Sequence, residues 1–343
     1  WTLLIVAVAV IGGVYAITVW QRSRETQRLM EELRSPDHAV AAQAMTLLRE
    51  RIASVDEELV EIAAQEGAPA RWRAIELLAH ADGDASRDAL MNALQAPDPV
   101  VRAAAASALA ERGVRGAADR IALMATAEEE SMPVRLAAVR ALQSLRTTTH
   151  LAELTRLATD RPPPPPVEEE ADADEEPADA EEPAADEAAD PAEEPVEEEP
   201  AEEWSDDTED LRIEAVRAIA VLGAHGEGAG AAGERPAQRA VAVLAEAAGP
   251  REHSARVRQA ACYALTDLAQ LELTDDVRTR VVEELLAAAD DEIGDVRIAA
   301  IHGLSVLTPP AELRDRVRQA MEDALSDDHY WVRVAAGEEP IGG

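Results

Sequence analysis

The sequence predicts an all-helical repeat protein, an α-solenoid of about eight two-helix repeats, and three observations lead to this prediction. A short motif recurs along the chain: a capping residue, then Val-Arg, then an Ala-rich amphipathic run. Once two inserted segments are set aside, the copies are 29 to 39 residues apart, which is the period of two-helix repeats. The chain has no Phe and only 2% aromatic residues, a composition that favours closely packed helices over a sheet.

The first element in the chain is a predicted transmembrane helix over residues 1–20, which contain no charged residue. Twenty helical residues span about 30 Å, the thickness of the hydrocarbon core of a bilayer. Tryptophans bracket the run, as at membrane interfaces, two glycines offer a helix-packing face, and arginines follow directly. The predicted anchor residues are Trp1, Gly12, Gly13, Trp20, Arg22 and Arg24.

The positive flank predicts that the following chain faces the cytoplasm, at a bacterial inner membrane. Residues upstream of Trp1 that are richer in Arg would reverse this orientation and place the repeats in the periplasm. A cleavable signal peptide, with a cleavage site at residues 14–16, is the alternative interpretation of the apolar run.

The repeats follow over residues 21–160 and 208–343, and the second helix of each repeat carries the motif. Because one repeat cannot bury its apolar face alone, stacking of neighbouring repeats completes the core. A side-chain oxygen at the helix start accepts a hydrogen bond from a free backbone N–H, which predicts caps at Asp37, Asp98, Ser131, Thr208 and Ser254. The motif arginines are Arg73, Arg102, Arg135, Arg212, Arg258, Arg297 and Arg333.

Residues 98–109 show the pattern D-x-x-V-R-x-x-A-x-x-A-L in full. This resembles the HEAT-repeat family, in particular the short bacterial HEAT-like repeats that also occur in bilin lyases. The resemblance covers roughly residues 30–160 and 205–340. It implies a protein-binding surface and a structural ladder of arginines between repeats.

The recurrent arginine has two interpretations, a structural group or a row that binds anions. Asp98 and Arg102 are four residues apart on one helix, a pair worth about 0.2–0.5 kcal/mol. We expect Arg102→Ala to lower the melting temperature without abolishing partner binding.

An acidic, Pro-rich segment over residues 161–207 is predicted to be a disordered insert between the fourth and fifth repeats. Residues 162–210 hold 24 of the 69 acidic residues and no basic one. Such a segment is either a solubilising insertion or a tether for a basic partner. The net charge of −37 excludes a nucleic-acid partner, which needs a basic footprint.

No pattern predicts catalysis, a cofactor or a metal site. The single cysteine, Cys262, lies in a helical pattern and is predicted to be a buried core residue. The seven histidines are scattered without metal-ligand spacing. Residues 228–233 match G-x-G-x-x-G but follow a helix, so they are interpreted as a loop between repeats.

The sequence therefore predicts a membrane-anchored scaffold, a non-catalytic accessory or structural subunit of a larger membrane complex whose other subunits it binds. A transient signalling or assembly adaptor at the membrane is the first alternative, and an enzyme resembling bilin lyases is the second. Tyr330 and Trp331 are predicted to form a docking patch or to cap the final repeat.

Overall fold

The computed structural model describes residues 23–159, 206–225, 236–252, 254–271 and 273–337. Within these ranges the chain forms helices and no strand, arranged as eight successive helix pairs. The first members of the pairs are residues 23–33, α3 (Asp56–Ala64), α5 (Asp84–Ala93), α7 (Ala118–Thr126), α9 (Leu151–Thr159), α11 (Pro236–Ala248), α13 (Asp275–Ala288) and α15 (Arg314–Ala324). The second members are α2 (His38–Arg49), α4 (Arg71–Leu78), α6 (Pro99–Glu111), α8 (Met132–Leu145), α10 (Asp206–His225), α12 (Ala255–Ala269), α14 (Gly294–Val306) and α16 (Tyr330–Ala336). Short 3₁₀ turns lie at Ile52–Ser54, Arg115–Ala117, Thr148–His150 and Ala311–Leu313.

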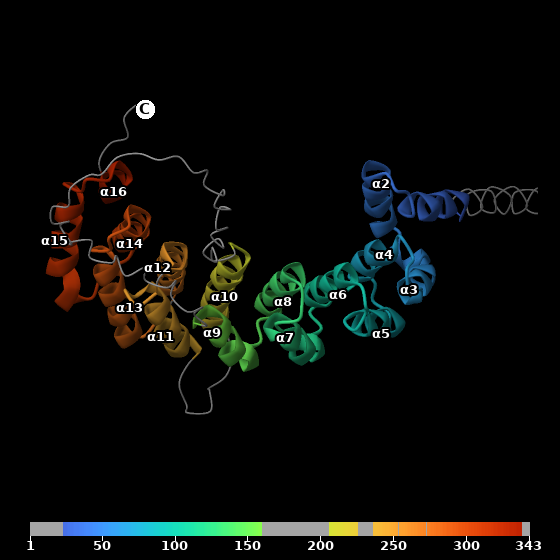
Figure 1. Ribbon diagram of the computed structural model, residues 1–343, viewed down its shortest axis with the longest axis horizontal. Helices are drawn as coiled ribbons and strands as arrows, with labels where there is room; N and C mark the ends of the chain where they lie inside the picture. Colours follow the sequence, from blue (N-terminus) through green and yellow to red (C-terminus); the bar gives the residue numbers. More distant parts are fainter. Residues whose placement is uncertain (1–22, 160–205, 226–235, 253, 272, 338–343) are drawn as a thin grey trace, which may run out of the picture.

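The pairs stack side by side into a curved solenoid of two layers (Figure 1). Each even-numbered helix from α6 to α14 contacts the even-numbered helices before and after it, as α10 contacts α8 and α12. The odd-numbered helices form the outer layer of the curve, and the even-numbered helices line its inner, concave side (Figure 1). The predicted α-solenoid is therefore confirmed for the described residues.

The core lies between the two layers and is made largely of alanine and leucine. In α6, Ala105, Ala106 and Leu109 are fully buried, and truncating such a leucine costs about 2–5 kcal/mol. Small residues allow the helices to approach closely. At Gly303 of α14, an added Cβ would lie 2.4 Å from Oγ1 of Thr266 and 2.9 Å from Cδ1 of Leu285, on two different neighbouring helices.

Three of the five predicted helix caps are confirmed. Oδ1 of Asp37 accepts from the backbone N–H of Ala39 at 2.8 Å, and Oδ1 of Asp98 accepts from Val100 at 2.9 Å. Oγ of Ser254 accepts from Val257 at 3.1 Å.

The other two cap predictions were wrong. Ser131 lies at the cap position of α8, but its side chain makes no capping hydrogen bond. Thr208 lies inside α10, because that helix begins at Asp206.

The position of the acidic segment differs from the prediction in one respect. Helix α9 ends at Thr159 and α10 begins at Asp206, and these two helices are partners that contact each other. The segment therefore interrupts a repeat between its two helices, instead of separating two repeats. The predicted disorder of residues 161–207 and the predicted loop at 228–233 lie mainly or wholly outside the described residues.

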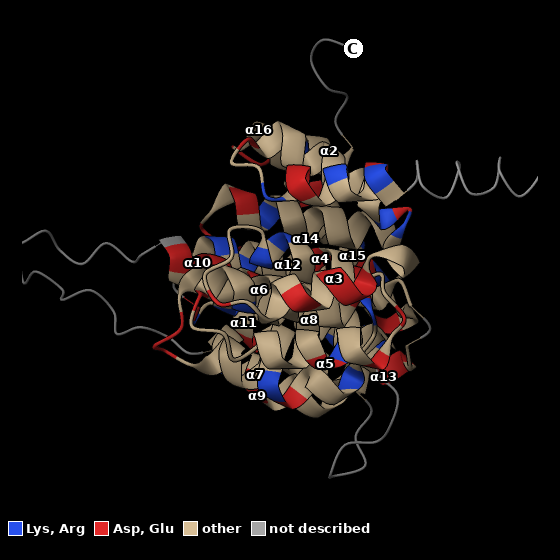
Figure 2. Ribbon diagram, turned by 90° about the vertical axis from the view of Figure 1, so that its right-hand side faces the viewer, with Lys and Arg blue, Asp and Glu red and all other residues tan. Residues whose placement is uncertain are grey.

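The predicted membrane anchor, residues 1–20, also lies outside the described residues. Among the helices that the structure describes, none combines the length and the apolar character that crossing a bilayer requires. Acidic and basic residues are interspersed along the helices of both layers (Figure 2).

Candidate functional site

The solvent-facing side of the inner layer has a regular composition that follows from the repeat. Each inner helix packs against an outer helix and against its inner neighbours, which leaves one face to solvent. In five successive repeats, from α6 to α14, the residue five positions after the motif arginine occupies that face. These residues, all exposed, are Ser107, Arg140, Arg217, Tyr263 and His302.

A groove of about 570 Å³ is hollowed into this face, lined by residues of α8, α10, α12 and the turn after α12. Its apolar lining residues are Ala220, Val221, Ala224, Ala260, Ala264, Leu268 and Leu271. Its polar lining residues are Gln143, Arg217, His225, Tyr263 and Asp267. An apolar floor with a few polar groups at its edge is typical of a site that binds part of another molecule.

Two arginines beside the groove share one carboxylate, that of Glu214. Nη2 of Arg140 lies 2.6 Å from Oε1 of Glu214, and Nη1 of Arg217 lies 3.7 Å from the same oxygen. The ring centroids of Tyr263 and His302 are 6.2 Å apart, with a tilt of 58° between the rings. Burial raises the pKa of Tyr263, and the carboxylate of Asp295 raises it further, so the phenol is neutral near pH 7.

All the aromatic residues of the described chain lie on inner helices: Trp72, Tyr263, Tyr330 and Trp331. The predicted docking residues Tyr330 and Trp331 form an edge-to-face pair at 5.0 Å, and Trp331 is 57% exposed. The guanidinium of Arg333 lies 5.6 Å from the centre of the Tyr330 ring. Aromatic residues are enriched at protein interfaces.

Four motif arginines bind the turn within their own repeat. Arg102, Arg258, Arg297 and Arg333 each donate through Nη1 to the carbonyl oxygen of the residue six positions earlier, at 2.7 to 2.9 Å. That carbonyl lies in the turn between the outer and the inner helix.

Two further arginines reach the last turn of the outer helix. Arg135 donates to Ala125 of α7 at 3.2 Å, and Arg212 donates to Ala158 of α9 at 3.2 Å. Both bonds satisfy carbonyl groups that a helix end leaves without a partner.

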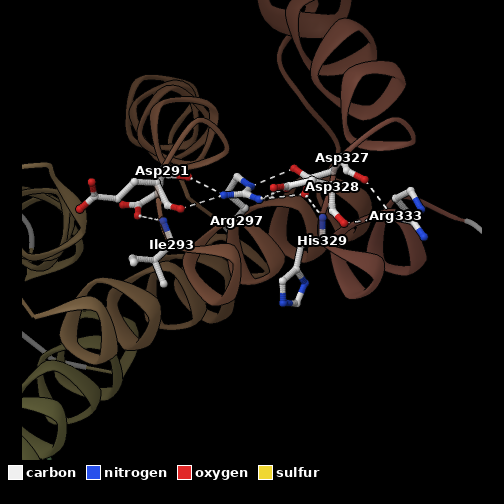
Figure 3. Close-up of polar contacts among 8 residues, drawn as sticks. Asp291, Ile293, Arg297, Asp327, Asp328, His329 and Arg333 are labelled. Carbon is white, nitrogen blue, oxygen red and sulfur yellow. Dashed lines mark hydrogen bonds and ion pairs between the residues drawn. The ribbon is translucent and has the colours of Figure 1, made fainter.

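Four of these arginines also bind an acidic residue in the turn of the next repeat. Nε and Nη2 of Arg258 lie 2.7 and 2.8 Å from the carboxylate of Asp291. Arg297 makes the equivalent pair with Asp327, at 2.8 and 2.9 Å (Figure 3). Arg102 pairs with Glu130 at 2.6 Å, and Arg212 pairs with Glu252.

The acidic partners are positioned by the backbone as well. Asp327 accepts from the N–H of His329 at 2.7 Å, and Asp291 accepts from that of Ile293 at 2.9 Å (Figure 3). The hydrogen bond from Arg297 is the main cause that lowers the pKa of Asp327 to about 2. Each inner arginine with such a partner thus joins its own turn to the turn of the following repeat.

Two details of this ladder differ from the sequence-based expectation. Arg102 pairs with Glu130 and not with Asp98, whose carboxylate caps α6. In the second repeat, Arg71 donates to Ala63 of α3 at 2.8 Å, whereas Arg73 donates to Leu33 of the preceding pair at 2.8 Å. The sequence contained a signal for this second difference. The interval from Arg73 to Arg102 is 29 residues, the shortest between motif copies, whereas the interval from Arg71 to Arg102 is 31 residues.

Two chemical features concern reactivity. No group of three His, Cys, Asp or Glu side chains within the described ranges is arranged to hold a metal ion. Cys262 is fully buried, as predicted, and burial is the main cause that raises the pKa of its thiol to about 12.

Comparison with known proteins finds a family match over part of the chain. Residues 57–131 and 88–171 match the family described as HEAT repeats. No curated protein matches the sequence.

Among solved structures, Escherichia coli YibA is similar with a TM-score of 0.50 and 16% identity, covering 90% of each chain. The karyopherin Kap121p bound to the extreme C-terminus of the phosphatase Cdc14p is similar with a TM-score of 0.53 and 14% identity, over 90% of this chain and 32% of that one. A Kap121p mutant gives 0.55 and 14%, over 92% and 33%, so this chain spans about a third of the karyopherin's length. The CpcE–CpcF phycocyanin lyase of Nostoc aligns with a TM-score of only 0.37, at 16% identity over 82% of this chain and 94% of that one. The family match supports a HEAT-repeat family, and the similarity to YibA and Kap121p shows the fold.

Proposed function

We propose that this HEAT-repeat chain is a non-catalytic scaffold that binds a partner protein on the inner face of its solenoid. The observation that carries the proposal is the groove between α8, α10 and α12, with its apolar floor and the exposed ring of Tyr263 at its edge. The karyopherin of similar fold is seen with a bound segment of another protein, which is in keeping with this use of the fold.

The ladder of arginines supports a rigid presentation of that face. Because Arg258 and Arg297 use their donors on turn carbonyls and on the carboxylates of the next repeat, we assign them to positioning the repeats. In this proposal the exposed inner-face residues, which lie five positions after the motif arginines, contact the partner.

Site-specific crosslinking from the full-length chain in its native membrane or cytosol tests the proposal. A photo-crosslinking amino acid at His302, on the inner face, should capture one protein in stoichiometric amount. The matched control places it at Leu123 of α7, which is 70% exposed on the outer layer, and should capture none. Equal capture at both positions, or capture at Leu123 alone, would overturn the assignment of the binding side.

The membrane anchor is a separate proposal that rests on residues 1–20 of the sequence. They contain no charged residue and are followed by Arg22 and Arg24, so we propose that they hold the repeats at the cytoplasmic side of a bacterial inner membrane. The chain should then stay with the membranes during alkaline carbonate extraction, and protease added to intact spheroplasts should leave the repeats uncut. Release of the full chain by carbonate would contradict anchoring, and cleavage in spheroplasts would reverse the orientation.

Membrane attachment would make the scaffold part of a membrane complex. A discrete detergent-solubilised assembly with companions in fixed ratio is the expected result of native purification. A lone chain would replace the fixed subunit by a transient adaptor.

A further inference from the structure

The edge of the groove at Tyr263 combines an aromatic face with carboxylates. Tyr263 is 40% exposed on α12. Asp267 follows it by four residues and therefore lies one helical turn away on the same side. Asp295 begins the neighbouring helix α14, and its charge contributes to the raised pKa of Tyr263. The electron-rich face of a tyrosine ring attracts a cation, and carboxylates beside it add to that attraction.

Both carboxylates at this edge are unpaired among the described residues. Within the described parts of the chain, neither Asp267 nor Asp295 has a salt bridge or a hydrogen bond. Glu214, in contrast, faces both Arg140 and Arg217. The Tyr263 edge of the groove therefore carries two carboxylates without an ion pair in the described chain, and Arg217, which lines the same groove, faces Glu214 instead.

The floor beside this edge is apolar. Ala260 and Ala264 belong to the same helix as Tyr263, and Leu268 and Leu271 continue the surface. Long basic side chains bury their methylene stems on such surfaces while their charged ends stay near polar groups. An acidic segment, by comparison, would meet Arg140 and Arg217 only in competition with Glu214.

We propose that the groove binds a basic segment of the partner protein, with an arginine or lysine side chain stacked on Tyr263 between Asp267 and Asp295. This inference rests on the proposed function and specifies the chemistry of the partner. The 24 acidic residues between positions 162 and 210 add a long-range attraction for the same partner.

Fluorescence anisotropy with the full-length chain and a labelled peptide of alternating arginine and leucine tests the proposal, with the glutamate-leucine peptide as the counterpart. Tyr263→Ala and Asp267→Asn should each weaken binding of the arginine peptide by about three- to tenfold. Tyr263→Phe keeps the ring and should bind as the native chain does. Asp276→Asn removes the same charge from α13, in the outer layer, and should leave the affinity unchanged.

A photoreactive group in the arginine peptide separates the groove from the acidic segment. Crosslinks to residues 255–271 are expected, whereas crosslinks confined to residues 160–205 would overturn the proposal. The proposal would also be overturned if the native chain bound the glutamate peptide more tightly than the arginine peptide. Equal affinities of Tyr263→Ala and the native chain for the arginine peptide would overturn it as well. If His302 still captured a protein in the crosslinking experiment above, the scaffold function would stand and only its basic partner would be wrong.

Discussion

Replacing Arg297 by alanine removes the side chain that joins the last two described repeats. In the native chain this guanidinium binds the carbonyl of Asp291 at 2.9 Å and the carboxylate of Asp327 at 2.8 and 2.9 Å. The side chains of Arg297 and Asp327 are each only 14% exposed. The substitution therefore leaves a largely buried carboxylate without its cation.

The size of the effect follows from this geometry. Breaking a buried ion pair by removing one partner costs about 3–5 kcal/mol, and the remaining exposure of this pair places it near 3 kcal/mol. Because repeat stability is a sum over neighbouring interfaces, the loss should concentrate in α15 and α16. Their amides should exchange hydrogen about 100-fold faster, whereas those of α6 and α8 should keep their native rates.

Hydrogen exchange followed by mass spectrometry resolves the two regions. Arg278→Ala is the matched control, because Arg278 lies 3.8 Å from a 96% exposed Asp275, and it should cost less than about 0.5 kcal/mol. Unchanged exchange of α15 and α16 in Arg297→Ala would refute the view that the ladder stabilises the stack.

The same pair predicts a dependence on pH. Since Arg297 lowers the pKa of Asp327 from 3.8 to about 2 in the folded chain, the ionised carboxylate stabilises the fold above pH 4. That contribution is lost as the pH falls toward 2. The stability difference between Arg297→Ala and the native chain should therefore be smaller at pH 2.5 than at pH 7.

Three further results are expected from thermal melts and thiol labelling. Gly303→Ala should destabilise the chain by about 1–3 kcal/mol, because the new Cβ would lie 2.4 Å from a side-chain oxygen of α12, whereas Gly116→Ala meets open space and should cost far less. Ser254→Ala should cost about 1 kcal/mol by removing a helix cap, and Ser131→Ala, which removes no capping hydrogen bond, should cost less than half of that. Cys262, buried with a pKa of about 12, should resist Ellman's reagent in the native chain and react fully in denaturant; rapid labelling of the native chain would contradict its burial.

The repeat and its period could be predicted from the sequence because each depends on local spacing. The capping carboxylates of Asp37 and Asp98 act on N–H groups two or three residues away, so a sequence pattern identifies them. The partners of the arginines could not be predicted in this way. Arg297 pairs with an aspartate 30 residues later, and only the stacking of two repeats brings these residues together.

The candidate site was missed for the same reason. Arg217 and Tyr263 are separated by 46 positions in the chain and become neighbours only because α10 and α12 pack side by side. Sequence reasoning identified Tyr330 and Trp331 because they are aromatic in a chain with few aromatics. It overlooked Tyr263, which has the same rarity but lies within a well-formed copy of the motif.

The break between α9 and α10 has a consequence for how the chain can be divided. These two helices meet through noncovalent contacts, including the hydrogen bond from Arg212 to Ala158. Across the same boundary, Arg140 of α8 binds Glu214 of α10. The chain can be divided into two polypeptides, one ending after α9 and one starting before α10. Each carries one half of this interface, so the two should reassemble when they are co-expressed. The solenoid therefore offers a split point for fragment-complementation reporters of its own assembly.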